Sequence, residues 1–147
     1  IEKNNILKNN TTLAIQEIAL TSAEDISLLE EKLSQSFDAL FLTIGKIMEE
    51  NFASIVYYAD AQNIPIIASH APNVSAGALG ALVSNHFKLG LACANQAKSI
   101  LIDKKNPSDI PVGITTEADI LLNAFVAENL EIEIPSAVLT SATEIFE

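Results

Sequence analysis

Six side chains that can donate or accept hydrogen bonds stand at the ends of three short apolar runs. The runs cover residues 38–43, 64–69 and 78–84. The side chains are Thr43, Ser69, His70, Ser84, Asn85 and His86. Hydroxyl, amide and imidazole groups of this kind orient small polar molecules in binding pockets. The pattern therefore indicates capture of a small polar ligand.

Some of these residues suit other roles equally well. Ser84 and Asn85 immediately precede a helical pattern, and both residue types cap helix N-termini by accepting backbone N–H groups. Capping and ligand contact are compatible for Asn85. For His70 and His86, a surface position or a helix start is the competing interpretation.

Signatures of catalysis are missing from the sequence. Gly45-Lys46 lacks the upstream Gly and the following Ser or Thr of a phosphate-binding loop. There is no Gly-x-Ser-x-Gly elbow and no HExxH spacing. Ser69 and His70 are neighbours in an expected strand, so their side chains point to opposite faces. We expect no enzyme, no catalytic residue, no metal site and no cofactor.

Composition narrows the possible partners. The 147 residues suit one domain or a large piece of a longer protein, and 49% of them are hydrophobic. The net charge is −11 and there is no Arg, which argues against binding to nucleic acid. The acidic pairs Glu30-Glu31 and Glu49-Glu50 are expected on the solvated faces of helices. No apolar run approaches the roughly 20 residues of a membrane span, and we identify no signal peptide.

Strand-like and helix-like segments alternate along the chain. We expect strands at 12–20, 38–43, 64–69, 78–84 and 110–114. We expect helices at 21–33, 46–62, 87–102, 118–128 and 136–146, with a loop at 70–76. Residues 1–11 read as a frayed lead-in. The order predicts a single α/β domain over 1–147, an open, mainly parallel five-stranded sheet with helices on both faces. Ligands bind at the carboxyl ends of the strands in such sheets, so the six side chains are expected along one rim.

Several short motifs carry a family resemblance through their order and spacing. They are Thr21-Ser-Ala-Glu-Asp25, Asp38-Ala-Leu-Phe-Leu42, Asn63-Ile-Pro-Ile-Ile67, Gly77-Ala-Leu79, Asn85-His-Phe-Lys-Leu-Gly90, Ala97-Lys-Ser-Ile-Leu101, Asn106-Pro-Ser-Asp-Ile-Pro-Val112, Asn123-Ala-Phe-Val-Ala127 and Ile132-Glu-Ile-Pro135. Together they resemble the substrate-binding proteins of ABC transporters, in the tryptophan/tyrosine-type group with the type 1 periplasmic-binding-protein fold. The resemblance covers the second half of such proteins.

The resemblance implies two α/β lobes joined by a hinge, with a ligand held in the cleft between them. The implied function is solute binding for an ABC-type importer, with an ABC permease as partner and a periplasmic or extracytoplasmic location. The passage around Asn85 would be a hinge strand, and the helix after it would pack on the first lobe. Two segments depart from the family pattern. Residues 43–46 replace Pro-Thr-Asp-Asn, and residues 81–83 replace a small residue followed by Tyr-Gly.

Two other functions stay open at this point. One is a ligand-sensing regulatory domain of the same fold. The other is a half-domain without a transport role, which forms a homodimer because the missing first lobe leaves apolar surface exposed.

Overall fold

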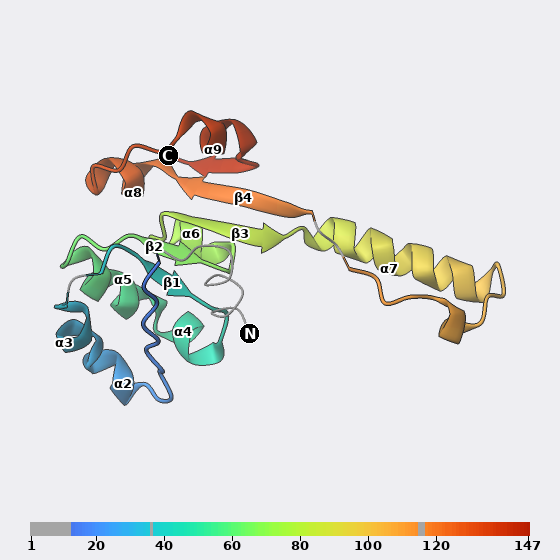
Figure 1. Cartoon of the computed structure of the whole chain (residues 1–147), viewed down its shortest axis with the longest axis horizontal. Helices are drawn as coiled ribbons and strands as arrows, with labels where there is room; N and C mark the ends of the chain where they lie inside the picture. The colour runs from blue at the N-terminus through green and yellow to red at the C-terminus, as the bar shows by residue number, and fades with distance from the viewer. Residues whose placement is uncertain (1–12, 36, 115–116) are drawn as a thin grey trace.

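The central sheet has five strands, and three of its four pairings are parallel. The computed structural model describes residues 13–35, 37–114 and 117–147. The strands are β1 (Leu40–Leu42), β2 (Ile66–Ala68), β3 (Gly80–Ser84), β4 (Ala118–Asn123) and β5 (Glu144–Phe146), in the order β1-β2-β3-β4-β5 (Figure 1). Only β3 and β4 are antiparallel. The predicted α/β class and mainly parallel five-stranded sheet are confirmed.

Two of the five expected strands were placed wrongly. Residues 13–20 form no strand, and neither do residues 110–114. Residue 12 and the expected lead-in at 1–11 lie outside the described part of the chain. In the second segment Pro111 has no backbone N–H to give to a ladder. Its carbonyl accepts instead from Gln96 Nε2 at 3.1 Å, so the segment runs along a helix.

Each of the last two expected helices contains a strand as well as a helix. The first half of segment 118–128 is β4, and only α8 (Ala124–Asn129) is helical. Segment 136–146 divides into α9 (Ser136–Ser141) and β5. Short apolar runs fit both the helical and the strand period. Residues 118–123 form a strand because they pair with β3, from Gly80–Leu122 to Ser84–Ala118. The expected loop at 70–76 contains the short helix α6 (Pro72–Ser75).

The core lies on one face of the sheet. The helices that fill it are α2 (Glu24–Ser27), α3 (Leu29–Leu33), α5 (Phe52–Asp60) and α6, whose apolar side chains pack on the inward residues of β1 to β4. The largest fully buried side chains are Leu29, Leu33, Ile55, Ile66 and Val74. A short helix, α4 (Lys46–Glu50), lies between β1 and α5.

The opposite face of the sheet is also apolar, but much of it is open to solvent. The register aligns Phe41 with Ile67 and Leu82 with Ile120 on this face. Phe41 is 53% exposed and Leu82 63%. A shallow apolar depression of about 240 Å³ lies over β2, β3 and β4. This face has the character of a surface that another element covers in α/β sheets.

A long helix leaves the body of the molecule. α7 (His86–Leu101) follows β3 and projects away from the sheet, and residues 102–114 return beside it through the 3₁₀ turn η1 (Pro107–Asp109) (Figure 1). We call α7 and residues 102–114 the arm. None of the α7 residues is buried, and Phe87 is 81% exposed and Leu101 68%. No helix in the described part of the chain is both long enough and apolar enough to cross a membrane.

Candidate functional site

The carboxyl ends of β1 and β2 lie side by side and are tied together by a side chain. Leu42 is paired with Ala68, so the next residues, Thr43 and Ser69, are level with each other. The Ser69 hydroxyl donates to the carbonyl oxygen of Leu42 at 3.0 Å. Thr43 is exposed and Ser69 is half-buried. Two of the six predicted site residues therefore meet at one edge of the sheet.

His70 forms a cluster with two residues that the sequence did not single out. Its Nδ1 lies 2.7 Å from Glu49 Oε2, and Asn73 Nδ2 donates to Glu49 Oε1 at 3.3 Å. Because a carboxylate only accepts, Nδ1 carries the proton in this contact. The three side chains come from α4, from the segment that follows β2, and from α6, and hydrogen bonds join them into one polar group.

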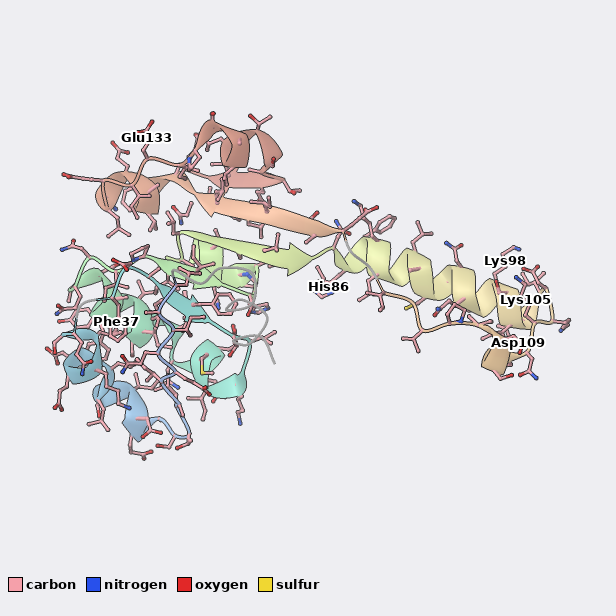
Figure 2. The ribbon with its side chains drawn as sticks, viewed as in Figure 1. Phe37, His86, Lys98, Lys105, Asp109 and Glu133 are labelled. Carbon is pink, nitrogen blue, oxygen red and sulfur yellow. The ribbon has the colours of Figure 1, made fainter. Side chains whose placement is uncertain are left out.

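The three remaining predicted residues lie farther along, where β3 passes into the arm. Ala68 is paired with Ala81, so β3 continues about 7 Å beyond the level of Ser69 before it ends at Ser84. Ser84 is exposed, and so is His86, which begins α7 (Figure 2). The six residues thus follow one edge in two groups: Thr43, Ser69 and His70 on the body, and Ser84, Asn85 and His86 at the root of the arm.

Both polar atoms of the Asn85 side chain form a hydrogen bond within the protein. Its Oδ1 accepts from the backbone N–H of Lys88 at 2.9 Å, so Asn85 caps α7 as expected. Its Nδ2 donates to Asp119 Oδ2 on β4 at 2.8 Å. The amide therefore links the strand that enters the arm to the strand that leaves it.

An ion pair lies beside this link. Lys88 Nζ is 2.5 Å from Glu117 Oε2. The hydrogen bond with Glu117 raises the pKa of Lys88, and the same bond with Lys88 lowers the pKa of the Glu117 carboxyl. Both side chains are more than half exposed, so the pair is screened by solvent and orients the arm more than it stabilises the fold.

The expectation that Glu49 and Glu50 both lie on a solvated face is wrong for Glu49. Glu50 does face solvent, with its side chain 61% exposed and 3.8 Å from Lys46. The Glu49 side chain is only 27% exposed and turns to His70. No pattern in the sequence links positions 49 and 70. Asp119 was missed for another reason, because its segment was taken for a helix.

The arrangement offers binding groups instead of reacting ones. The Ser69 hydroxyl is directed to a backbone carbonyl and the His70 ring to a carboxylate, so they do not form a nucleophile–base pair. Among the described residues, no three His, Cys, Asp or Glu side chains are grouped so that they could hold a metal ion.

A larger depression, of about 410 Å³, lies away from this edge. Asn63 and Gly77, which line it, come before β2 and β3, not after them. Its buried polar residue, Asn123, already donates to the Val74 carbonyl at 2.8 Å and accepts from the Val126 N–H at 3.0 Å. Because this amide is satisfied, the depression has no buried polar group waiting for a ligand. The edge beyond β1, β2 and β3 remains the better candidate.

Comparison with known proteins gives a consistent result. The family described as "ABC transporter substrate binding protein" matches residues 1–146. A curated relative, the "Tyrosine-binding protein" of Clostridioides difficile (strain R20291), is 27% identical over 130 residues, which are 88% of this chain and 37% of the relative.

Solved structures share the fold. One is a structure described as the ABC domain in complex with L-Trp from Streptococcus pneumonia, with a TM-score of 0.77, 23% identity and coverage of 99% of this chain and 50% of that one. Another is a ligand-free, open substrate-binding protein with adhesive properties from Clostridium difficile, with a TM-score of 0.79, 23% identity and coverage of 98% and 48%. The chain spans about half the length of these solved proteins.

Proposed function

Because this chain belongs to the family of ABC transporter substrate-binding proteins, we propose that it is a solute-binding component of an ABC-type importer, present as a C-terminal half. It captures a small, amino-acid-like ligand by hydrogen bonding, without covalent chemistry. The observation that carries the proposal is the polar edge beyond β1 and β2, where Thr43 and Ser69 are level with each other and His70, the residue after Ser69, is bonded to Glu49.

The arm supports a cleft between two lobes. A helix whose residues are all at least partly exposed gains little from packing on its own chain, and isolated helices of about this length are marginal in water. The exposed Phe87, Leu91 and Leu101 side chains give α7 apolar surface for a partner. In this proposal the arm packs on a complementary lobe, which then faces the polar edge and closes over the ligand.

The six site residues take different parts in this proposal. Thr43, Ser69 and His70 contact the ligand directly. Ser84 and His86 border it nearer the arm, and Asn85 fixes the direction in which the arm leaves the sheet. Closure is a hinge motion that ligand binding favours by population shift. The whole protein acts outside the cytoplasm and delivers its ligand to an ABC permease.

Aromatic amino acids are the first ligands to test. The names of two similar proteins mention tyrosine and L-Trp. Hydroxyl, imidazole and carboxylate groups at the edge suit the polar end of such molecules, and apolar surface on the arm and on the lobe that it meets suits the ring.

Calorimetry on two proteins tests the proposal. The first is this chain, and the second is a chimaera in which residues 13–146 replace the matching half of the Clostridioides difficile relative. We expect the chimaera to bind L-tryptophan or L-tyrosine at least about tenfold more tightly than the chain alone, because it restores the second wall of the cleft. Equal affinities would refute the two-lobe cleft, and no binding by either protein would refute the function.

A second candidate function is supported by the exposed apolar surfaces. Leu82 on the open sheet face and Phe87 on the arm are large and exposed, which is typical of surfaces that another chain covers. A homodimer of half-domains would cover them. Light scattering across a range of concentrations tests this candidate. A dimer that Leu82→Glu converts to a monomer would support it, and a monomer at every concentration would dismiss it.

A further inference from the structure

We propose that Glu49 is the specificity-determining residue of the polar edge, and that its carboxylate binds the ammonium group of the ligand. The inference rests on the proposed function and deepens it, because it assigns the recognised chemical group to one residue. Glu49 lies outside segment 43–46, the segment in which the family pattern has an acid and this chain has none.

Glu49 is placed for this role by its position on α4. That helix starts directly after residues 43–45, so its first turn lies at the carboxyl end of β1. The Glu49 backbone N–H donates to the Gly45 carbonyl at 2.9 Å, which fixes the turn that carries the side chain. The Glu49 side chain is 27% exposed, so it is not closed off from solvent at this edge. Glu50, the next residue, is directed to Lys46.

The carboxylate is held in one orientation. His70 contacts Oε2 and Asn73 contacts Oε1, one donor for each oxygen. Asn73 is only 5% exposed, and its backbone N–H donates to the His70 carbonyl at 3.2 Å, so the two donors are themselves connected. A group held in place before binding loses little freedom when the ligand arrives.

The cluster has the chemistry to select a cation. A carboxylate oxygen accepts about two hydrogen bonds, so each oxygen keeps room for one more donor. Glu49 is the acidic group of this cluster, and Asn73 brings no charge. An ammonium group would form charge-assisted hydrogen bonds with Glu49, which are about twice as strong as neutral ones. A ligand with a carboxylate at this point would be repelled.

A simpler interpretation is that Glu49 and His70 only tie α4 to the end of β2. The two interpretations differ in what they predict for ligands with and without an amino group. The probes are L-tryptophan and indolepropionate, which keeps the ring and the carboxylate but lacks the ammonium group. Titrations of the 147-residue chain are followed by the shifts of backbone amide NMR signals, which detect weak binding.

We expect L-tryptophan to shift signals of residues 43–49 and 69–73 in a saturable way, and indolepropionate to bind at least about tenfold more weakly. Glu49→Gln should raise the Kd for L-tryptophan by about tenfold or more. The Kd for indolepropionate should stay unchanged or fall slightly. Glu50→Gln is the matched control, and it should bind both compounds as the unmodified chain does. Amide spectra of the two variants verify that each is folded.

The outcomes distinguish failure of the role given to Glu49 from failure of the proposed function. Glu49 does not bind the ammonium group if the two compounds bind with equal affinity, or if Glu49→Gln lowers both affinities equally. In either case the proposed function stands without the inference. If neither compound binds at the edge at millimolar concentrations, the proposed function is refuted and the inference with it.

Discussion

The amide of Asn85 joins the two strands that meet at the root of the arm. Nδ2 donates to Asp119 on β4 at 2.8 Å, and Oδ1 accepts from the N–H of Lys88 in the first turn of α7. One side chain therefore fixes both the start of α7 and the distance between the outgoing and returning strands. Because β3 and β4 are antiparallel, the arm is anchored at both of its ends.

Replacement of Asn85 by Ala should loosen the arm. The variant loses the helix cap and the bond to Asp119, and we expect the free energy of unfolding to fall by about 1–2 kcal/mol. Asn85→Ser keeps a capping oxygen but is too short to reach Asp119, so it should recover part of the loss. Urea unfolding followed by circular dichroism measures both. Equal losses in the two variants would show that the cap contributes nothing measurable.

The first half of the fold follows from the sequence because its signals are local. Segments 38–43, 64–69 and 78–84 are short apolar runs between helical patterns, and each contains a strand. The second half was misread at 118–128 and 136–146, where short apolar runs fit either period. The deciding contacts there are long-range, such as the pairing of Leu82 with Ile120. Single-sequence patterns do not carry such contacts.

The candidate site shows the same division. That Ser69 and His70 lie at the carboxyl end of a strand was predictable, and so was the capping role of Asn85. The hydrogen-bond partners of His70 and Asn85 were not predictable. Glu49 is 21 residues from His70 in the sequence, and Asp119 is 34 residues from Asn85. The departure at 43–46, where the resembling family has an acid, gave no indication that a carboxylate on the next helix would occupy the edge.

Two glycines provide a matched pair of substitutions. A Cβ at Gly80 would lie 2.9 Å from the carbonyl oxygen of Leu121, in the strand paired with β3, whereas a Cβ at Gly90 meets nothing within 4 Å. We expect Gly80→Ala to destabilise the protein by about 1–3 kcal/mol, because the paired backbone cannot move away easily. Gly90→Ala should stabilise it by about 0.5–1 kcal/mol as a better helix former. Urea midpoints test both, and a stable Gly80→Ala protein would contradict the close approach of β3 and β4.

Asp25 should make stability depend on pH in the acid range. Its carboxylate accepts the Thr21 N–H and hydroxyl at 2.8 Å each and the Ser22 N–H at 3.0 Å. These bonds, the Thr21 backbone bond first, lower the pKa of Asp25. A depressed pKa stabilises the fold above the unfolded value of about 3.9 and ceases to do so as pH falls through the folded value.

The test is a comparison of Asp25→Ala with the unmodified chain. The difference between their urea midpoints should be largest near neutral pH and should shrink below about pH 4, as the native carboxylate takes up its proton. Because Asp25 is only half-buried, added salt should also reduce the difference. A difference that stays constant down to the acid limit of folding would contradict the role given to the charge.

Asn123 connects α6 to α8, because its side chain forms a hydrogen bond with each of them. It is 7% exposed, donates to the Val74 carbonyl and accepts from the Val126 N–H. Asn123→Ala removes both bonds from a buried position, so we expect a loss of about 2 kcal/mol, against less than about 0.5 kcal/mol for the exposed Asn129→Ala on the same helix. Asn123→Asp separates the two bonds, because it keeps the capping oxygen but turns a second oxygen toward the Val74 carbonyl. At neutral pH this variant should unfold at a lower urea concentration than the native chain, and an unchanged midpoint would mean that the bond to Val74 does not hold α6 in place.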